Sequence, residues 1–245
     1  MGDYDKKSAS YREWTKSNNP YFLLELHSIL SAIGDVRGLE LLDVACGEGR
    51  LSRLLLEHGA ESVLGVDVSK KTIAEAKKQG CPGSSGHEKG ELRYDVVSAC
   101  DEDFQLDRPV DMVTALYLFH YANSLKQLEE MCQFIGRNLK PGGRFVTYGI
   151  NPDFDFANQD RRIEEIFGFR YEPEAPPECL LIVGDFSARF WHWSKAAHEE
   201  CLANAGFTNI RWHPLTLPKD YGADLPDISW YLDNPSCVVL EAEKR

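Results

Sequence analysis

Short apolar runs alternate with amphipathic segments along most of the chain. Apolar residues recur at helical spacing over residues 21–33, and Gly34 ends that pattern. From residue 39 onward, apolar runs short enough for buried strands are separated by further segments of helical spacing. The expected strands are 39–45, 62–68, 92–99, 110–118 and 144–150, and the expected helices are 49–58, 70–79 and 125–139. This alternation predicts an α/β fold with a doubly wound, mostly parallel sheet covered by helices on both faces.

The alternation stops after the fifth expected strand. Segment 151–193 is rich in Asp, Phe, Pro and Glu, and the prolines of PEAPPE at 173–178 exclude a regular helix or a central strand there. We interpret this segment as an insertion that forms a lid over a site. The PGG at 141–143, just before the fifth expected strand, predicts a tight turn.

The remaining segments complete a single domain over residues 1–245. A helix is expected over 194–205, and two last strands are expected over 208–217 and 236–242. Residues 1–35 are expected to form an N-terminal arm followed by a cap helix, because a polar stretch with interleaved aromatics precedes the first amphipathic segment. No linker separates independent domains.

Charge and composition narrow the possible partners. The formal net charge is −12 and no basic run is present, so a phosphate backbone would be repelled and no nucleic-acid partner is expected. The seven cysteines include no CxxC pair, which argues against a metal site and for reduced thiols. No apolar run approaches the roughly 18 residues of a membrane span, and the N-terminus lacks the apolar core of a secretory signal. We therefore expect a cytoplasmic protein without a membrane partner.

A glycine-rich turn joins the first expected strand to the helix that follows. Gly47 and Gly49 permit unusual backbone conformations, and the helix N-terminus offers N–H groups to an anion such as a carboxylate. The third glycine of the dinucleotide fingerprint GxGxxG is missing, and no GK[ST] of a phosphate-binding loop follows. Asp43, at the end of the strand, disfavours a pyrophosphate and suits an ammonium group. The alternative is a tight turn that binds no ligand.

Acidic residues also follow the second and third expected strands. Asp67 lies 24 residues after Asp43, where a carboxylate can accept hydrogen bonds from ribose hydroxyls. Asp101 and Glu102 follow the third strand, where a carboxylate can accept from an adenine amino group. Each acid alone fits a solvated loop. Together they lie at the edge where open α/β sheets bind ligands, and they suit a nucleoside that carries an amino-acid group, as S-adenosylmethionine does.

Over roughly residues 35–245 the sequence resembles the class I S-adenosylmethionine-dependent methyltransferases. LLDVACGEG resembles the family's cofactor loop, VLGVD its ribose-binding strand, DMVTALYLFHYA its fourth strand and LKPGGRFV the turn into the fifth. The resemblance implies a seven-stranded sheet with an antiparallel last strand, and methyl transfer from a sulfonium to a nucleophile. It places the methionyl part at Asp43, Ala45 and Gly47, the ribose at Asp67, the adenine beside Val68, Asp101 and Glu102, and a backbone contact at Leu116.

The N-terminal YDKKSASYREW is similar to the arm of small-molecule methyltransferases related to the ubiquinone and toxoflavin enzymes. In those relatives an arm tyrosine closes over the cofactor carboxylate, which implies that role for Tyr11. Packing of Tyr11 and Trp14 within a cap helix is the alternative. The NNPY at 18–21 is similar to a tetrad of nucleic-acid amino-methyltransferases, but it precedes a helix instead of ending the fourth strand. We therefore favour a small-molecule substrate.

Two histidines are candidate general bases. His120 follows the fourth strand and would serve if its pKa lies near the working pH, and His192 lies within the aromatic cluster 190–193. Tyr117, Tyr121 and that cluster either line an acceptor pocket or pack as ordinary core. Methyl transfer to an amine or thiolate needs no strong base, because proximity and alignment supply much of the rate.

The sequence thus predicts a methyltransferase that uses S-adenosylmethionine and acts on an O, N or S atom of a small, aromatic or heterocyclic metabolite, in the manner of secondary metabolism. The alternatives are a methyltransferase acting on protein, a cofactor-binding fold that catalyses another reaction, and a non-catalytic partner subunit. The metabolite, the acceptor atom and the oligomeric state stay open.

Overall fold

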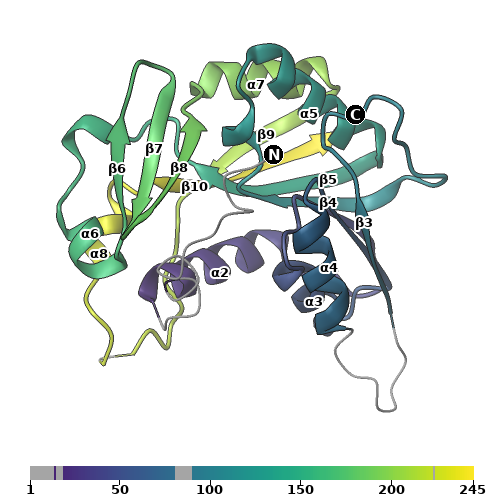
Figure 1. The fold of residues 1–245 in the computed structure, drawn as a ribbon. Helices are drawn as coiled ribbons and strands as arrows, with labels where there is room; N and C mark the ends of the chain where they lie inside the picture. Colours follow the sequence, from purple (N-terminus) through teal and green to yellow (C-terminus); the bar gives the residue numbers. More distant parts are fainter. Residues whose placement is uncertain (1–13, 15–18, 81–89, 223) are drawn as a thin grey trace.

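The computed structural model describes residues 14, 19–80, 90–222 and 224–245. Its centre is a seven-stranded sheet in the order β3-β2-β1-β4-β5-β10-β9 (Figure 1). The strands from β3 to β5 run parallel to their neighbours, whereas β10 is antiparallel to both β5 and β9. This confirms the predicted sheet with its antiparallel last strand. The strands are β1 (Glu40–Val44), β2 (Ser62–Asp67), β3 (Glu91–Val96), β4 (Val110–Leu116), β5 (Leu139–Ile150), β9 (Phe207–His213) and β10 (Cys237–Lys244).

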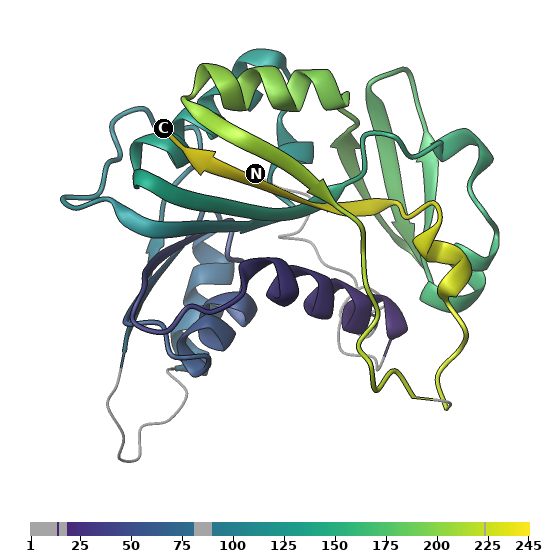
Figure 2. The ribbon, with the colours of Figure 1, turned by 180° about the vertical axis from the view of Figure 1, so that it is seen from behind.

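Helices cover both faces of this sheet, as Figures 1 and 2 show. Serine and asparagine side chains at the N-caps accept from first-turn N–H groups in four of these helices. One face carries α2 (Pro20–Ile33), α3 (Arg50–Glu57) and α4 (Lys70–Gln79), and the other carries α5 (Leu125–Arg137) and α7 (Lys195–Asn204). The strand order reverses between β1 and β4, and the crevice at the carboxyl ends of such strands is where open α/β sheets bind ligands.

The predicted tight turn at 141–143 is wrong, because these residues lie inside β5. Val110 pairs with Leu139 and Met112 pairs with Arg144, so the extra residues on β5 form a bulge. Gly142 adopts φ +76°, a left-handed conformation that glycine allows without strain. The strand therefore starts five residues earlier than the apolar pattern indicated.

The insertion after β5 contains regular structure that the sequence did not indicate. A three-stranded antiparallel sheet in the order β6-β7-β8 follows two short helices and stands beside the main sheet (Figure 1). Pro173 ends β6, and the other prolines of the PEAPPE stretch lie in the connection to β7. These elements are η3 (Phe156–Asn158), α6 (Arg162–Phe167), β6 (Arg170–Pro173), β7 (Glu178–Val183) and β8 (Phe186–Trp191), and α8 (Ser229–Leu232) follows later.

The two faces of the main sheet have separate apolar cores. On the α5 and α7 face, Phe134, Phe145 and Phe207 are fully buried. On the α2 and α3 face, the core continues from Tyr148 of β5 into the insertion, where Tyr171 is also buried. The insertion and the main sheet therefore share one apolar cluster. Among the described residues, no helix is both long and apolar enough to cross a membrane.

Arg144 of β5 fixes the C-terminal end of α2. Its guanidinium donates to the carbonyls of Ile33 and Ala32 at 2.9 and 2.7 Å, and its Nε donates to Glu241 of β10 at 2.8 Å. The last carbonyls of a helix lack partners within that helix, so these bonds satisfy groups that would otherwise need water. The cap helix is thereby attached to the centre of the sheet.

Asp43 joins β1, β4 and α3 at the point where the strand order reverses. Its side chain is 1% exposed. One carboxylate oxygen accepts from the Ser52 hydroxyl of α3 at 2.5 Å, and the other accepts from the Thr114 hydroxyl of β4 at 2.9 Å. Burial raises the pKa of Asp43 to about 6, although both hydrogen bonds act in the opposite direction.

Replacing Arg144 by Met should lower the free energy of unfolding by about 2 kcal/mol, because two helix carbonyls and one carboxylate lose a charged donor. Urea denaturation would measure this, with Arg211→Met at an exposed position of β9 as the matched control. Equal stability of the two variants would show that Arg144 does not hold α2 in place.

Asp43→Asn should change how stability depends on pH. A carboxyl whose pKa is higher in the folded state than in the unfolded state stabilises the fold when protonated, and that contribution is lost as pH rises through the folded pKa of about 6. The unfolding free energy of the wild type, measured relative to Asp43→Asn, should therefore fall by about 1 kcal/mol between pH 5 and pH 7.5. Parallel pH profiles for the two proteins would contradict this account.

Candidate active site

The turn between β1 and α3 is held in an unusual backbone conformation. Ala45, Gly47 and Gly49 have φ values of +56°, +54° and +76°. A left-handed conformation is uncommon for alanine, and such strained positions concentrate at functional sites. A Cβ built on Gly47 would meet no atom of the described residues within 4 Å, so this part of the turn is open as far as the structure describes it. Gly49 is the N-cap of α3 without a side-chain cap, which leaves N–H groups at the helix start for a ligand.

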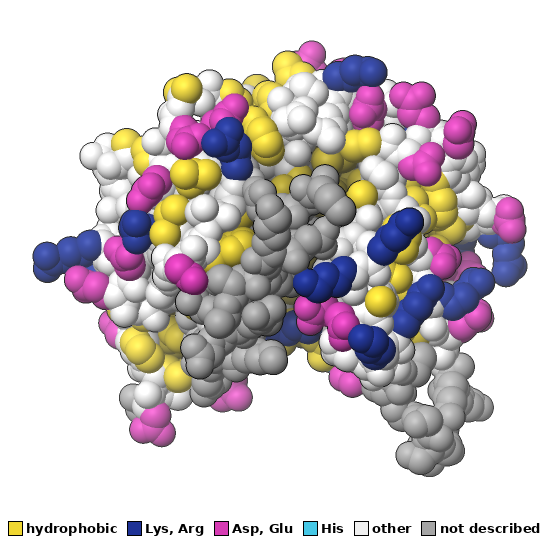
Figure 3. Space-filling view, viewed as in Figure 1, with side chains coloured by type: hydrophobic (Ala, Val, Ile, Leu, Met, Phe, Trp, Pro, Cys, Tyr) yellow, Lys and Arg dark blue, Asp and Glu magenta, His cyan; other side chains and the backbone are white. Residues whose placement is uncertain are grey.

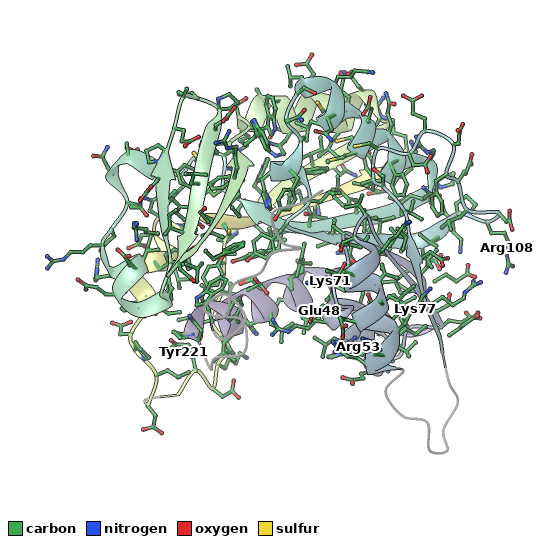
Figure 4. The ribbon with its side chains drawn as sticks, viewed as in Figure 1. Glu48, Arg53, Lys71, Lys77, Arg108 and Tyr221 are labelled. Atoms are coloured by element: carbon green, nitrogen blue, oxygen red, sulfur yellow. The ribbon has the colours of Figure 1, made fainter. Side chains whose placement is uncertain are left out.

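The opposite side of the turn is tightly supported. Tyr94 of β3 donates from its hydroxyl to the Gly49 carbonyl at 3.3 Å, and a Cβ on Gly49 would overlap that hydroxyl. A Cβ on Gly65 would lie 2.6 Å from the Tyr94 ring. Arg53, labelled in Figure 4, donates to the Glu48 carbonyl at 2.7 Å and so fixes the outer side of the turn. Gly49 is needed for packing, whereas Gly47 leaves room.

Asp67 connects the turn after β1 with the turn after β2. Its carboxylate accepts from the Gly47 N–H at 3.0 Å and from the Ser69 N–H at 2.8 Å. The Thr72 hydroxyl donates to the same carboxylate at 3.2 Å. The acid expected to bind a ribose therefore lies directly beside the open glycine turn.

The other predicted cofactor residues lie at or beyond the carboxyl ends of the strands. Val68 is 69% exposed, an uncommon position for a large apolar side chain. Asp101 and Glu102 form an exposed turn beyond β3, in which Asp101 accepts from the N–H groups of Asp103 and Phe104. Leu116 is the last residue of β4 and is half-buried.

Asp43 and Tyr11 differ from the other predicted cofactor contacts. Asp43 was expected to face an ammonium group. Its two oxygens instead accept from Ser52 of α3 and Thr114 of β4, so Asp43 holds together the elements on either side of the glycine turn. Tyr11 lies outside the described residues.

His120 is buried in the short helix η2 (Phe119–Tyr121). Its Nδ1 atom has no hydrogen-bond partner in the described chain, and burial lowers the pKa of the imidazole to about 3. The condition for a general base, a pKa near the working pH, is therefore not met in this structure. The ring contributes to a small cavity of about 20 Å³, also lined by Phe119, Thr147, Gly149, Ile150, Trp191, Trp193, His198, Trp212, Val238 and Leu240.

His192, the second candidate base, lies elsewhere. Its Nε2 donates to the Asn151 carbonyl at 3.1 Å, and its ring packs against Phe156 with 4.7 Å between the ring centroids. His192 does not line the cavity beside His120, whereas His198 of α7 does. Sequence reasoning missed His198, because nothing but its helical position distinguishes it. The described residues contain no group of three His, Cys, Asp or Glu side chains that could hold a metal ion.

A second strained residue follows β4. Tyr117 has φ +57°, and its hydroxyl donates to Glu25 of α2 at 2.5 Å. The register pairs Val44 of β1 with Ala115 of β4, so the turns that begin at Ala45 and after Leu116 are neighbours. The sequence identified Tyr117 only as an aromatic residue near the pocket, and it gave no sign of Glu25.

Comparison with known proteins also indicates a methyltransferase domain. Residues 41–143 match the family model described as a methyltransferase domain. A ubiquinone biosynthesis O-methyltransferase of Leptothrix cholodnii is 28% identical over 130 residues, which cover 52% of this chain and 51% of that protein. The match thus spans about half the length of that relative. An N-demethylindolmycin N-methyltransferase of Streptomyces griseus is 24% identical over 223 residues, with 88% of each chain covered.

Solved structures share the fold at lower identity. An S-adenosylmethionine-dependent methyltransferase from Mesorhizobium loti superposes with a TM-score of 0.63 at 19% identity, over 90% of this chain and 98% of that one. The sheet order, the strained glycine turn after β1 and the matched domain agree with one another. Residues 41–143 thus carry a methyltransferase domain, and the chain shares its fold with S-adenosylmethionine-dependent methyltransferases of known structure.

Proposed function

We propose that this protein transfers a methyl group from S-adenosylmethionine to a small, aromatic or heterocyclic metabolite. The observation that carries the proposal is the open side of the glycine turn, where no described atom fills the space at Gly47 beside the Asp67 carboxylate and the exposed Val68. The names of two relatives, which refer to ubiquinone biosynthesis and to N-demethylindolmycin, support a small-molecule acceptor.

The residues present fit the cofactor, which supplies an activated methyl group on a sulfonium. The N–H groups at the start of α3 suit its carboxylate, and the Asp67 oxygen that accepts only from Gly47 keeps one acceptor position for a ribose hydroxyl. Val68 offers an apolar surface to the adenine, because its side chain is exposed without a ligand. Asp101 and Glu102 would accept from the adenine amino group. Asp43 acts through the turn that it supports.

The acceptor would lie between the carboxyl end of β4 and the insertion. Tyr117, His120 and Phe190 approach one another there, with ring centroids 5.9 Å apart for Tyr117 and His120 and 6.0 Å apart for His120 and Phe190. Aromatic side chains of this kind stack with planar rings. A neutral His120 suits hydrogen bonding to the acceptor better than proton abstraction at neutral pH.

The surface charge supports the same choice of substrate. On the face shown in Figure 3, the described Lys and Arg side chains alternate with Asp and Glu and form no continuous basic stripe. Nucleic-acid binding depends on such a stripe. The formal net charge of −12 also disfavours binding to a phosphate backbone.

Gly47→Ala should weaken cofactor binding without unfolding the protein. Gly47 and Gly142 both have left-handed φ values and an open Cβ position, so alanine at either should cost about 1–2 kcal/mol of stability. Only Gly47→Ala should weaken S-adenosylmethionine binding, by more than about tenfold, because the new methyl group occupies the cofactor side of the turn. Calorimetric titration of both variants measures this, and equal affinities would place the cofactor elsewhere.

Methyl transfer itself should be visible as a labelled product. Purified protein incubated with S-adenosylmethionine carrying a labelled methyl group and a panel of phenols, indoles and aromatic amines should yield a labelled small molecule by mass spectrometry. Basic peptides and RNA form the comparison arms. Label found only in peptide or RNA would overturn the small-molecule assignment, and a protein that binds no S-adenosylmethionine would overturn the whole proposal.

A further inference from the structure

A chain of hydrogen-bonding side chains runs from β10 to α2 beside the carboxyl end of β4. The Cys237 thiol lies 3.2 Å from the Tyr21 hydroxyl, and that hydroxyl lies 3.0 Å from the hydroxyl of Tyr117. Tyr117 donates its only proton to the Glu25 carboxylate, which can only accept while it is ionised. Tyr21 must then donate to Tyr117, and Cys237 to Tyr21. Every proton in the chain points toward Glu25.

The strained backbone of Tyr117 brings this chain to the active site. A bulky residue at φ +57° is a rare conformation, and the Tyr117 N–H is held by the Tyr148 carbonyl at 2.8 Å. Tyr117 is half-buried, whereas Glu25 is 4% exposed. Tyr117 is therefore the most exposed member of the chain and directly follows β4 at the edge of the crevice, whereas the carboxylate end stays away from solvent.

The surroundings of Glu25 keep it basic. Burial raises the pKa of the Glu25 carboxyl, while the Tyr117 hydrogen bond and the charge of Arg50 act to lower it. Arg50, at the start of α3, lies 3.7 Å from the other carboxylate oxygen. The remaining titratable neighbours are Tyr148 of β5 and Cys237 of β10, and burial raises the pKa of both groups, so they stay neutral. A carboxylate with a raised pKa accepts a proton more readily at neutral pH.

We propose that Tyr117 is a catalytic residue and that Glu25 acts through it, so that together they receive the proton of a hydroxyl acceptor of phenol type. This inference rests on the proposed methyl transfer. The acceptor's proton passes to the Tyr117 oxygen while the Tyr117 proton passes to Glu25. The acceptor oxygen keeps the electron pair and bonds to the methyl carbon. The carbon–sulfur bond breaks, its electrons stay on sulfur, and S-adenosylhomocysteine leaves uncharged.

A hydroxyl acceptor follows from the chemistry of this arrangement. A phenol is mostly protonated at neutral pH, since its pKa is about 10, so its oxygen becomes a good nucleophile only when a base takes the proton. A neutral amine has a free electron pair and needs no such base. A buried carboxylate that is connected to the crevice by a tyrosine is therefore best explained by an O–H acceptor.

The test uses 4-nitrophenol, whose ionised form is yellow, bound to the full-length protein loaded with S-adenosylhomocysteine. The wild type should ionise bound 4-nitrophenol below the pKa that the probe has in water. Tyr117→Phe and Glu25→Gln should raise the apparent pKa of the bound probe by at least about one unit, a tenfold change. Tyr221→Phe is the control, because it removes a tyrosine hydroxyl that donates to the Pro226 carbonyl, away from the chain.

The possible outcomes separate this inference from the proposed function. Loss of the colour shift in both variants, with S-adenosylhomocysteine affinity unchanged and Tyr221→Phe behaving as wild type, supports it. Equal shifts in wild type, Tyr117→Phe and Glu25→Gln overturn it, and so does a wild type that binds the cofactor product but not the probe. A wild type that fails to bind S-adenosylhomocysteine refutes the proposed function itself. Circular dichroism of each variant shows whether it is folded.

Discussion

The active site depends first on a single buried carboxylate. Asp43 accepts from Ser52 and Thr114, and so ties α3 and β4 to β1 where the strand order reverses. Each of these elements contributes one side of the crevice, because the glycine turn leads into α3 and Tyr117 follows β4. Burying the carboxylate costs stability, as its raised pKa shows. The hydrogen bonds fix the relative positions of the elements that must meet the cofactor and the acceptor.

Two of the three described non-glycine residues with a left-handed backbone lie at the same crevice, and the third, Asn209, lies in β9. Ala45 and Tyr117 adopt left-handed conformations immediately beyond paired residues of neighbouring parallel strands. Strain of this kind persists only where the surrounding structure determines it strongly. Here Tyr94 supports the first turn and Tyr148 holds the second by a backbone hydrogen bond. The two strained turns have different tasks, since one leaves an opening over Gly47 and the other presents a hydroxyl.

The sequence predicted those parts of the site that depend on backbone pattern. The succession of strands and helices, the glycine turn and the position of Asp67 follow from apolar periodicity and short motifs, whereas the seven-stranded sheet was implied by the family resemblance. The direction of Asp43 did not, because a strand-end side chain can face a ligand or its own core. The β6–β8 sheet was missed because its strands are short and lie beside prolines. Glu25 was missed because it sits on the buried face of α2, and its partner Tyr117 is 92 residues away.

The cap helix α2 is the element that makes a buried acid possible at this position. Arg144 bonds the carbonyls at its C-terminal end. At the other end, Asn19 caps the helix and also donates to the Phe167 carbonyl of the insertion at 2.7 Å. The helix therefore spans from the main sheet to the insertion with both ends fixed, and Glu25 lies between these anchors. A carboxylate on a loop could turn toward solvent, whereas on this helix it must stay between Tyr117 and Arg50. The fixed helix thus connects the proposed cofactor side of the crevice, through Arg50, with the proposed acceptor side, through Tyr117.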